Sequence, residues 1–505
     1  MTRRSTLSAP ARRAKALRRR ITTPERRAKT NHRPPSSSSA SPVRRVFTLL
    51  ASLLLVSSSA ARADFAPTLR RMSPLQAATT QPPSLSADDE AFLEDLQRRA
   101  FRYFLEHSDP QTGLVLDRAH TDGTAHDATR HNHNVASSAA TGFGLTALCI
   151  AAERGWIPLR EARHRAHTAL LFFAERAPHK QGWFLHWMDK STGERRWQSE
   201  YSSIDTALLL AGVLTVRRYF RGDSELERLA TKIYERVDFR WMLNGHPTLL
   251  SHGWKPETGF LKVRWDTYSE HLILQLLAIG SPTHSITPAA WLAWHRTRRT
   301  YEGFTYLSSS APLFIHQYSH AWVDFRRRSE NWYPFTDYFA NSVAATRAHR
   351  IFCINLAREF PGYGEDMWGI TASDSAEGYV AWGGPPRDER IDGTLVPCAA
   401  GGSLQFTPDI SLRTLRTMRQ RFGSSVYGRY GFADAFNPNN GWVSPDVIGI
   451  DLGITLLSAE NLRTANVWRW FMRNDEIPRA MKLVGLLQRQ KVKGKRQGRG
   501  GNPFF

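Results

Sequence analysis

Cysteine is scarce in this sequence, which limits both disulfide and metal chemistry. Only Cys149, Cys353 and Cys398 occur among 505 residues, so the chain can form at most one internal disulfide. No C-x-x-C pair or His-rich cluster predicts a metal site, and we expect all three cysteines to be buried as small hydrophobic residues. The sequence therefore predicts a protein with no bound metal.

Motifs of several common enzyme classes are also missing. No G-x-S-x-G elbow, Walker loop or dinucleotide fingerprint stands between a strand and a helix, so we expect no nucleotide cofactor. His316 and His320 lie four residues apart in "FIHQYSHAWVDFR" and could share one face of a helix. Without an H-E-x-x-H motif, this pair predicts substrate contact or core packing rather than zinc binding.

Apolar runs long enough to span a bilayer do not occur after the N-terminal region. There, "VFTLLASLLLV" follows Arg44–Arg45 and precedes Ala61 and Ala63, an A-x-A pattern that predicts a signal peptide cleaved after Ala63. Because the basic segment before this run is unusually long, a downstream start codon or an uncleaved anchor are alternatives. The predicted localisation is periplasmic or secreted, with membrane contact only through the signal or an uncleaved anchor.

Positive charge is plentiful but confined to the two ends of the chain. The formal net charge is +22, of which residues 1–63 carry +14 and the tail from Arg489 carries +6. The body, Asp64–Gln488, is close to neutral and does not predict nucleic-acid binding. We expect a basic N-region with signal peptide at 1–63, a linker at 64–85, a folded domain at 86–488 and a disordered basic tail at 489–505.

Helical periodicity dominates the body. After Ser86, a plausible N-cap, Leu93, Leu96 and Ala100 recur at helical spacing. Twelve helices are predicted, near 86–107, 136–154, 160–177, 203–220, 224–238, 268–279, 287–300, 335–358, 406–421, 448–461, 463–473 and 477–487. "GWFLHWMD" and "TGFLKVRW" predict small β-hairpins at one rim. About twelve helices without a short repeat indicate one all-α domain, and a helical-hairpin toroid or a less regular bundle would both fit.

Acidic residues near aromatic residues are the main candidates for chemistry. Glycoside hydrolysis uses two carboxyl groups, one to protonate the leaving oxygen and one to activate water or attack the sugar. Aromatic rings suit this reaction because they stack on sugars and raise the pKa of a neighbouring acid by excluding water. The candidates are Asp205, Glu257, Asp266, Glu270, Asp324, Glu365, Asp366, Asp374, Asp434, Asp446 and Asp451.

The leading acids also have structural explanations. Glu270 and Asp205 fall in predicted first helical turns, where a carboxylate favours the helix dipole or supports the N-cap. Asp451 lies between apolar flanks in "VIGIDLGITLL", where a lone acid must be paired, hydrogen-bonded or functional. Position alone therefore favours a structural role for Glu270 and leaves both roles open for Asp451.

Several segments together resemble the bacterial glycoamylase-like domain, a group that includes the endo-β-1,2-glucanases of glycoside hydrolase family 144. They are "SSIDTALLLAGVLTVRRYF", "YSEHLILQLLAIGSPTH", "PLFIHQYSHAWVDFR", "YGEDMWGITASD", "YGRYGFADAFNP" and "IGIDLG". The resemblance covers roughly residues 88–487. It implies an (α/α)6 toroid with a cleft at one end, and inverting glucanases that need no metal or organic cofactor.

The resemblance also implies roles for individual residues. Glu270 in "YSE" matches the acid of the family, and Asp451 in "GIDLG" is the favoured base. Asp205 in "IDTA" matches a further acidic cleft position and is the third expected catalytic residue. Asp374 in "TASD" matches a position that binds sugar or organises water. The other expected substrate contacts are Tyr268, His320, Trp322, Trp368, Trp382, Trp442 and Asp446, with Tyr363 and Tyr379 also near subsites and Trp322 equally compatible with the core.

One departure from the family pattern lies beside the expected base. The resemblance predicts "GIDQGP" where this chain reads "GIDLGI", so Leu452 and Ile454 replace Gln and Pro. Leu452 could alter subsite contacts or mark a different substrate. The leading hypothesis is an exported glycoside hydrolase that cleaves a β-glucan, most simply β-1,2-linked, with inversion. The alternatives are a non-catalytic periplasmic glycan-binding toroid, an exo-acting glucosidase of different linkage, and a lyase.

Overall fold

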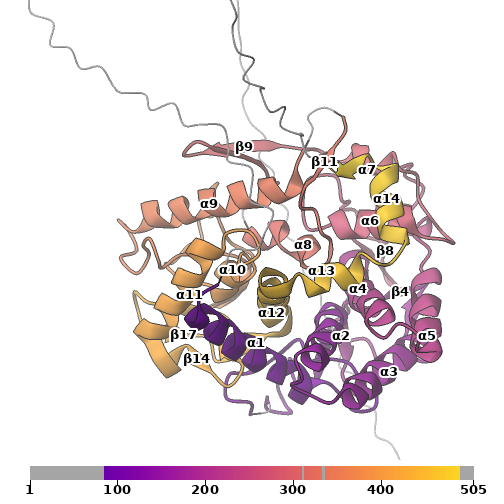
Figure 1. Cartoon of the computed structure of the whole chain (residues 1–505), viewed down its shortest axis with the longest axis horizontal. Coiled ribbons are helices and arrows are strands. Elements are labelled where there is room, and N and C mark those ends of the chain that lie inside the picture. Colours follow the sequence, from indigo (N-terminus) through magenta and orange to yellow (C-terminus); the bar gives the residue numbers. More distant parts are fainter. Residues whose placement is uncertain (1–84, 125, 310–311, 333–335, 489–505) are drawn as a thin grey trace, which may run out of the picture. The chain divides into compact units, whose positions relative to one another are not determined.

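The computed structural model describes residues 85–488, except residue 125 and residues 310–311 and 333–335 (Figure 1). All of these described residues belong to one contact unit, Ala77–Phe505. The predicted signal peptide, nearly all of the predicted linker, and the basic tail lie outside them. Among the described residues, none of the helices combines the length and the apolar character that crossing a bilayer requires.

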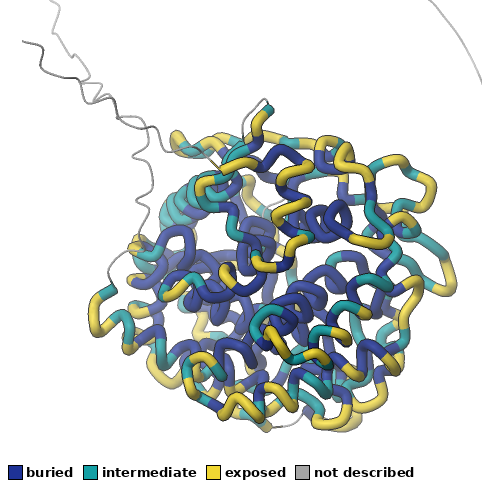
Figure 2. The backbone as a smooth tube through the Cα atoms, turned by 45° about the vertical axis from the view of Figure 1, so that its right-hand side comes forward, coloured by how far each residue is buried: buried dark blue, intermediate teal, exposed yellow. Residues whose placement is uncertain are grey.

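Four of the described helices longer than eight residues are buried around almost their whole circumference. They are α2 (Ser138–Glu153), α4 (Ser203–Tyr219), α6 (Leu272–Gly280) and α12 (Gly449–Thr464). A helix that is apolar on every side must be surrounded by other elements. Accordingly, α12 packs against α2, α2 against α4, and α4 against α6, which makes these helices an inner layer. Figure 2 shows the buried interior in dark blue.

A second set of helices buries only one face, and four of its five members pack on the inner layer. It comprises α1 (Ala87–His107), α3 (Leu159–Glu175), α5 (Ser224–Glu235), α11 (Pro408–Phe422) and α14 (Glu476–Leu483). Helix α1 packs against α2 and α12, α3 against α2, α5 against α4, and α14 against α6 (Figure 1). The Ser86 hydroxyl accepts the N–H of Asp89 at 3.1 Å, which confirms the predicted N-cap of α1.

Helices α2 and α4 approach so closely that their crossing requires glycine. A Cβ atom at Gly142 would lie 2.2 Å from the carbonyl oxygen of Leu208, and one at Gly212 would lie 2.2 Å from the carbonyl oxygen of Gly142. Because no side chain fits between the two backbones, glycine at both positions permits the contact. This crossing fixes the two inner helices, including their N-terminal ends, relative to each other.

The remaining helices are short, apart from α9. They are α7 (Ala290–Ala293), α8 (Tyr318–Trp322), α9 (Tyr338–Leu356), α10 (Pro397–Gly401) and α13 (Asn466–Phe471), with 3-10 turns η1 (Trp241–Leu243), η2 (Leu313–His316) and η3 (Gly423–Ser425). Helices α8 and α10, which pack against α12, were not predicted. Five residues are too few for a helical period to be visible in the sequence.

The helix predicted at 287–300 is wrong over most of its length. Only Ala290–Ala293 is helical, because Arg298–Tyr301 forms strand β9 and pairs with β10 (Phe304–Leu307). Glu302 and Gly303 join the two strands with φ values of 46° and 81°. Two left-handed residues are typical of a tight hairpin turn, so the local turn overrides the apolar spacing upstream.

Two other predicted helices differ from the observed ones by four residues at one end. The helix predicted from 268 begins at Leu272, because the N–H of Tyr268 donates to the carbonyl of His295 at 3.0 Å and thereby holds the preceding segment extended. The helix predicted to reach 487 ends at Leu483. Gly485 follows with a φ of +73°, and the chain then continues as a strand.

The strands are short, and all named strand pairs are antiparallel. Apart from β9–β10, they are β1 (Arg118–His120) with β18 (Asp446–Ile448), β2 (Val135–Ser137) with β5 (Trp187–Asp189), β3 (His179–Lys180) with β4 (Trp183–Phe184), β6 (Tyr201–Ser202) with β7 (Gly253–Lys255) and β8 (Gly259–Phe260), β11 (Arg328–Glu330) with β19 (Leu486–Gln488), β12 (Ser373–Ser375) with β13 (Gly378–Val380), β14 (Tyr427–Gly428) with β15 (Gly431–Phe432), and β16 (Phe436–Asn437) with β17 (Trp442–Val443). The predicted hairpin segments "GWFLHWMD" and "TGFLKVRW" supply β4, β5 and β8.

Three of these strands lead directly into inner helices: β2 into α2, β6 into α4, and β18 into α12. Backbone pairing links them in series. Strand β18 pairs with β1, Leu116 bridges Ala136 in β2, and Leu185 bridges Tyr201 in β6. The N-terminal ends of these inner helices are therefore joined by short strands, and side chains from the first helical turns and the strands before them converge there.

Candidate active site

The three predicted catalytic acids lie at the N-terminal ends of inner helices. Asp205 and Asp451 are in the first turns of α4 and α12, and Glu270 comes two residues before α6. Ser202 caps α4, since its hydroxyl accepts the N–H of Asp205 at 3.2 Å and donates to Oδ2 of the same residue at 2.5 Å. The three predicted acids thus lie at or just before the starts of inner helices. A carboxylate at such a position is also favoured by the helix dipole and by capping.

Glu270 lies in surroundings that favour its protonated form. Burial is the main cause that raises its pKa; the hydrogen bond from the Ser269 hydroxyl lowers it, and the negative charge of Asp205 adds a further rise. The nearby N-terminal end of α6 would favour the ionised form, but burial outweighs it. A carboxyl group with a raised pKa is suited to donate a proton.

Asp205 is paired with a histidine that sequence analysis did not single out. Nε2 of His186 lies 3.5 Å from Oδ1 of Asp205, and Nδ1 of His186 lies 3.1 Å from Oε1 of Glu200. Burial alone would lower the pKa of His186, but the two carboxylates raise it. The ring also stacks on Trp187 at a centroid distance of 3.4 Å. His186 therefore holds Asp205 in place and offers it a positive charge.

Asp451 is 6% exposed and belongs to a buried carboxyl pair. Burial raises its pKa to about 6, while hydrogen bonds from Asp434 and from the Cys398 thiol lower it; the thiol sulfur lies 3.2 Å from Oδ1. Burial and then the charge of Asp451 raise the pKa of Asp434 well above its usual range, so Asp434 is the protonated partner. Asp451 is thus the ionisable member of the pair near neutral pH, as a general base requires.

A small cavity adjoins this carboxyl pair. It has a volume of about 20 Å³ and is lined by Cys398, Asp434, Asp451 and Leu452, among others. This space suits one water molecule. Leu452, the residue that departs from the expected family pattern, therefore lies against the same cavity as Asp451.

Asp117 is the principal acid that sequence analysis missed. Its charge raises the pKa of both Asp205 and Asp451, so it lies within electrostatic range of both predicted groups. Trp187 donates to its Oδ1 at 3.3 Å, and its carbonyl accepts the N–H of Gly449 at 2.7 Å. Asp117 occurs in "GLVLDR", directly after an apolar run and before Arg118, and its place at the end of that run was the only local signal.

Asp374 is held by the arginine that follows Asp117. The Arg118 guanidinium contacts both carboxylate oxygens of Asp374, at 3.0 and 3.2 Å, and Ser444 donates to Oδ2 at 3.1 Å. The N–H of Asp374 donates to Asp434 at 2.7 Å. Asp374 is therefore linked to the Asp434–Asp451 pair through its backbone N–H.

Tyr318 lies within electrostatic range of both Glu270 and Asp451. Burial raises its pKa well above the usual range, and the charges of Asp451 and Glu270 add to the rise. Both predicted catalytic acids are therefore within electrostatic range of one phenol group, which sequence analysis did not select. Tyr318 lies in α8, the short helix that the sequence did not reveal.

Most of the predicted aromatic contacts are core residues. Tyr268, Trp322 and Trp368 are 0% exposed, and Trp382 is 2% exposed, so none of these rings has a face open to a sugar. His320 is 1% exposed and packs against phenylalanine rings. Tyr363 is also buried. This placement favours core packing over substrate contact for all six, because the ring spacing that predicts stacking equally suits a hydrophobic core.

Other predicted substrate contacts are more accessible or are already paired. Trp442 in β17 is partly buried, and Tyr379 in β13 is 53% exposed. The Asp446 carboxylate is 2.8 Å from Nδ1 of His120 and 3.0 Å from Nε2 of His126. Trp442 and Tyr379 thus keep surface for a ligand, whereas Asp446 already has partners from the protein.

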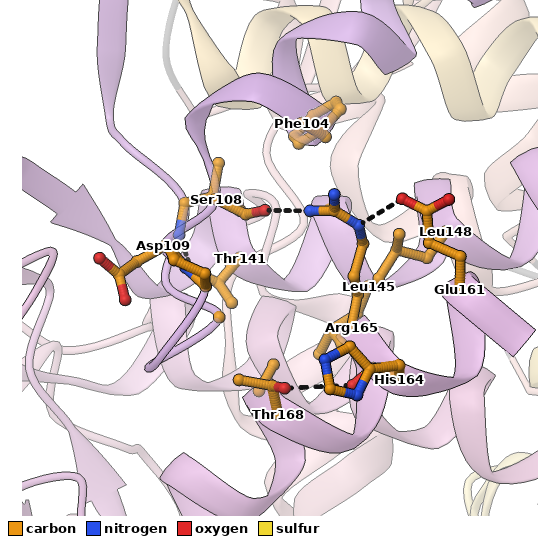
Figure 3. Close-up of a pocket in the computed structure, with 15 residues that line it drawn as sticks. Phe104, Ser108, Asp109, Thr141, Leu145, Leu148, Glu161, His164, Arg165 and Thr168 are labelled. Atoms are coloured by element: carbon orange, nitrogen blue, oxygen red, sulfur yellow. Dashed lines mark hydrogen bonds and ion pairs between the residues drawn. The ribbon is translucent and has the colours of Figure 1, made fainter. Parts of the chain in front are cut away.

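The hollow drawn in Figure 3 lies elsewhere. This cavity of about 190 Å³ is lined by residues of α1, α2, α3 and the loop after α1, and none of the predicted site residues borders it. The Arg165 guanidinium lies in it: Nε donates to Glu161 at 3.0 Å, and Nη1 lies 3.5 Å from the Ser108 hydroxyl (Figure 3). The two acids that line this cavity already have partners: Glu161 is paired with Arg165, and Asp109 accepts backbone N–H groups of its own loop. This cavity is therefore less suited to the predicted chemistry.

The chain is thus a helix-rich protein whose candidate site is built from carboxyl groups at the N-terminal ends of inner helices. Residues 262–475 match a family model described as "Putative glucoamylase". A solved structure from Bacteroides fragilis NCTC 9343 with the same description is 30% identical, with a TM-score of 0.72, and the match covers 83% of this chain and 100% of that one. This chain belongs to that glycoamylase family.

Two further relatives have more specific descriptions. An endo-β-1,2-glucanase from Chitinophaga pinensis, solved as a sophorotriose and glucose complex, is 28% identical with a TM-score of 0.73, over 80% of this chain and 99% of that one. An exo β-1,2-glucooligosaccharide sophorohydrolase (non-reducing end) from Parabacteroides distasonis is 28% identical over 459 residues, 83% of this chain. That match spans 61% of the relative, less than two thirds of its length.

Proposed function

We propose that this protein is a glycoside hydrolase that cleaves β-1,2-glucan. The observation that carries the proposal is the raised pKa of Glu270 within range of Asp205, at one end of a helix-rich fold. Glycoside hydrolysis uses one carboxyl group that stays protonated and a second that ionises. The second is Asp451, which lies within electrostatic range of Tyr318, as Glu270 does. The substrate class follows from two relatives, described as an endo-β-1,2-glucanase and a β-1,2-glucooligosaccharide sophorohydrolase.

In the proposed mechanism, Glu270 donates its proton to the glycosidic oxygen as the bond from that oxygen to the anomeric carbon breaks. Asp451 accepts a proton from a water molecule, directly or through a second water, and that water attacks the opposite face of the sugar. The product therefore has inverted configuration. Asp205, paired with His186, supports the protonated form of Glu270 by its negative charge.

We further propose that the inner and outer helices close into an (α/α)6 toroid, with the short strands at the rim of the cleft. The inner layer already runs from α12 through α2 and α4 to α6, which supports this closure. Asp374 would bind sugar or organise water, and Trp442 and Tyr379 would contact the glucan at the rim. The predicted export to the periplasm or cell exterior suits a polymeric substrate, which cannot readily enter the cell.

The experiment uses purified protein, residues 64–505, incubated with linear β-1,2-glucan while new reducing ends are counted. Wild-type protein should release them, and Glu270→Gln should lower the rate by about 10²–10⁴-fold. Glu359→Gln, which alters an exposed glutamate paired with Arg387, is the matched control and should leave the rate unchanged. Circular dichroism checks that each variant is folded. No release by folded wild-type protein, or equal rates in Glu270→Gln and wild type, would contradict the proposal.

Exo-action is the second candidate, and the relative from Parabacteroides distasonis favours it. An endo-acting enzyme would give a broad range of oligosaccharides early in the reaction, whereas an exo-acting enzyme would release one short product from the start. Chromatography of products at less than about a tenth of complete digestion separates the two modes. Binding of intact glucan without products would instead favour the non-catalytic alternative.

A further inference from the structure

Two histidines and an aspartate converge beside the candidate active site. His120 in β1 and Asp446 in β18 are partners in the strand register, and His126 follows in the next loop. Oδ1 of Asp446 lies 2.8 Å from Nδ1 of His120 and 3.0 Å from Nε2 of His126. These ligand-type atoms all lie within 4.8 Å of one another. The pairing of β1 with β18 therefore brings the loop that carries His126 to Asp446, 320 positions further along the sequence.

The three side chains form a preorganised and sheltered set. The side chains of His126 and Asp446 are 5% and 9% exposed, whereas that of His120 is 27% exposed. The imidazole rings are nearly perpendicular, at 84°, with centroids 4.2 Å apart. Both rings direct one nitrogen to the same carboxylate oxygen, Oδ1 of Asp446. Because His120 is partly exposed, an ion could reach this oxygen from solvent on the His120 side.

We propose that His120, His126 and Asp446 bind a divalent transition metal, with Zn²⁺ as the best-suited ion. Two imidazole nitrogens and one carboxylate oxygen are a ligand set that Zn²⁺ accepts, with a water in the fourth position. Zinc bonds of about 2.0–2.1 Å would separate tetrahedral ligand atoms by roughly 3.3–3.4 Å. The observed separations from Asp446 therefore need to open by only about half an ångström.

The surrounding charges define which oxygen serves as ligand. Arg118 lies 3.9 Å from Oδ2 of Asp446 and pairs more closely with Asp374, so a metal would bind on the Oδ1 side. A second cluster, His186 with Glu200 and Asp205, is less suited. It has one imidazole, which already lies between two carboxylates, and it belongs to the candidate active site.

A bound metal would tie the loop after β1 to the strand that leads into α12. Asp446 begins β18, and the first turn of α12 carries Asp451 five residues later. The ion would therefore stabilise the entrance of that helix without contacting the carboxyl pair. This proposal does not depend on the proposed glucanase activity, because its test measures metal binding.

The test is calorimetric titration of untagged, chelator-treated full-length protein with ZnCl₂. We expect one site per chain, and affinity reduced at least about 10-fold in both His120→Gln and His126→Gln. Glutamine keeps a hydrogen-bond donor for Asp446, which favours folding of both variants. His164→Gln, at a histidine of α3 outside this cluster, should bind as wild type does.

X-ray absorption at the zinc edge gives a second measurement that needs no variant. The zinc-loaded wild-type protein should show two imidazole nitrogens in the coordination sphere. The proposal is overturned if wild-type protein takes up no zinc, if both folded glutamine variants bind zinc as tightly as wild type, or if the bound zinc has one imidazole ligand or none.

Discussion

The thiol of Cys398 lies 3.2 Å from Oδ1 of Asp451 and donates a hydrogen bond to it. Burial raises the pKa of this thiol well above its usual range, so it remains a donor at neutral pH. The bond favours ionised Asp451. A cysteine that sequence analysis treated as a small hydrophobic residue therefore adjusts the proposed base, although it is indeed free and buried, as are Cys149 and Cys353.

Replacing Cys398 should move the acidic limb of the activity profile. In Cys398→Ala the donor is lost, the pKa of Asp451 rises, and the limb of kcat/KM should shift upward by roughly 0.5–1 pH unit. Cys398→Ser keeps a hydrogen-bond donor and serves as the control. Its acidic limb of kcat/KM should lie at the same pH as that of wild type or at a lower pH. Equal limbs in the alanine variant and wild type would show that the thiol does not act on the base.

The wild-type enzyme should have a bell-shaped dependence of kcat/KM on pH. Activity should rise as Asp451, with a pKa of about 6, loses its proton, and fall at higher pH as Glu270 loses the proton that burial helps it retain. The residual activity of Glu270→Gln should lack the descending limb. A descending limb that persists at the same pH in this variant would assign it to another group.

Loss of Arg118 should destabilise the protein much more than loss of a surface arginine. Arg118→Ala would leave the buried carboxylate of Asp374 without its ion-pair partner, and we expect a loss of about 3–5 kcal/mol in the free energy of unfolding. Arg163→Ala removes an exposed pair with Asp223 and should cost much less, because solvent screens that pair. Urea unfolding of both variants measures the difference, and similar losses would contradict a buried, structurally required pair.

The glycine crossing of α2 and α4 can be tested in the same way. Gly142→Ala places a methyl group against the carbonyl of Leu208 and should cost more than about 2 kcal/mol, because neither backbone can move freely. Gly364→Ala has open space around the added carbon and should change stability by less than about 0.5 kcal/mol. A Gly142→Ala protein as stable as wild type would mean that the two helices can separate.

Periodic segments could be predicted from the sequence, whereas contacts made by distant strands could not. Apolar spacing gave α4 at 203–220, against the observed Ser203–Tyr219, and it placed Asp205 in the first turn. It failed at 287–300, where a two-residue turn creates a hairpin. Period and caps are local properties, so they reveal helices well but cannot show which ends of helices meet.

The residues of the candidate site could likewise be predicted only where the signal was local in the sequence. Glu270 and Asp451 carried signals in their own neighbourhoods, through a resemblance and through apolar flanks. His186 and Asp117 had no local signal strong enough to assign a role, because their importance arises from partners far away in the sequence. The expected aromatic contacts present another difficulty, since burial in a core and stacking on sugars select the same side chains.

The glycine contact between α2 and α4 also bears on how such a protein can diversify. Where backbone touches backbone, there is no side chain whose exchange could widen or narrow the gap. The position of α4, which carries Asp205, is therefore almost insensitive to drift in the residues around it. Changes in product length or substrate reach must then arise in the strands and loops at the helix ends, where a substitution or insertion leaves the supporting helices in place.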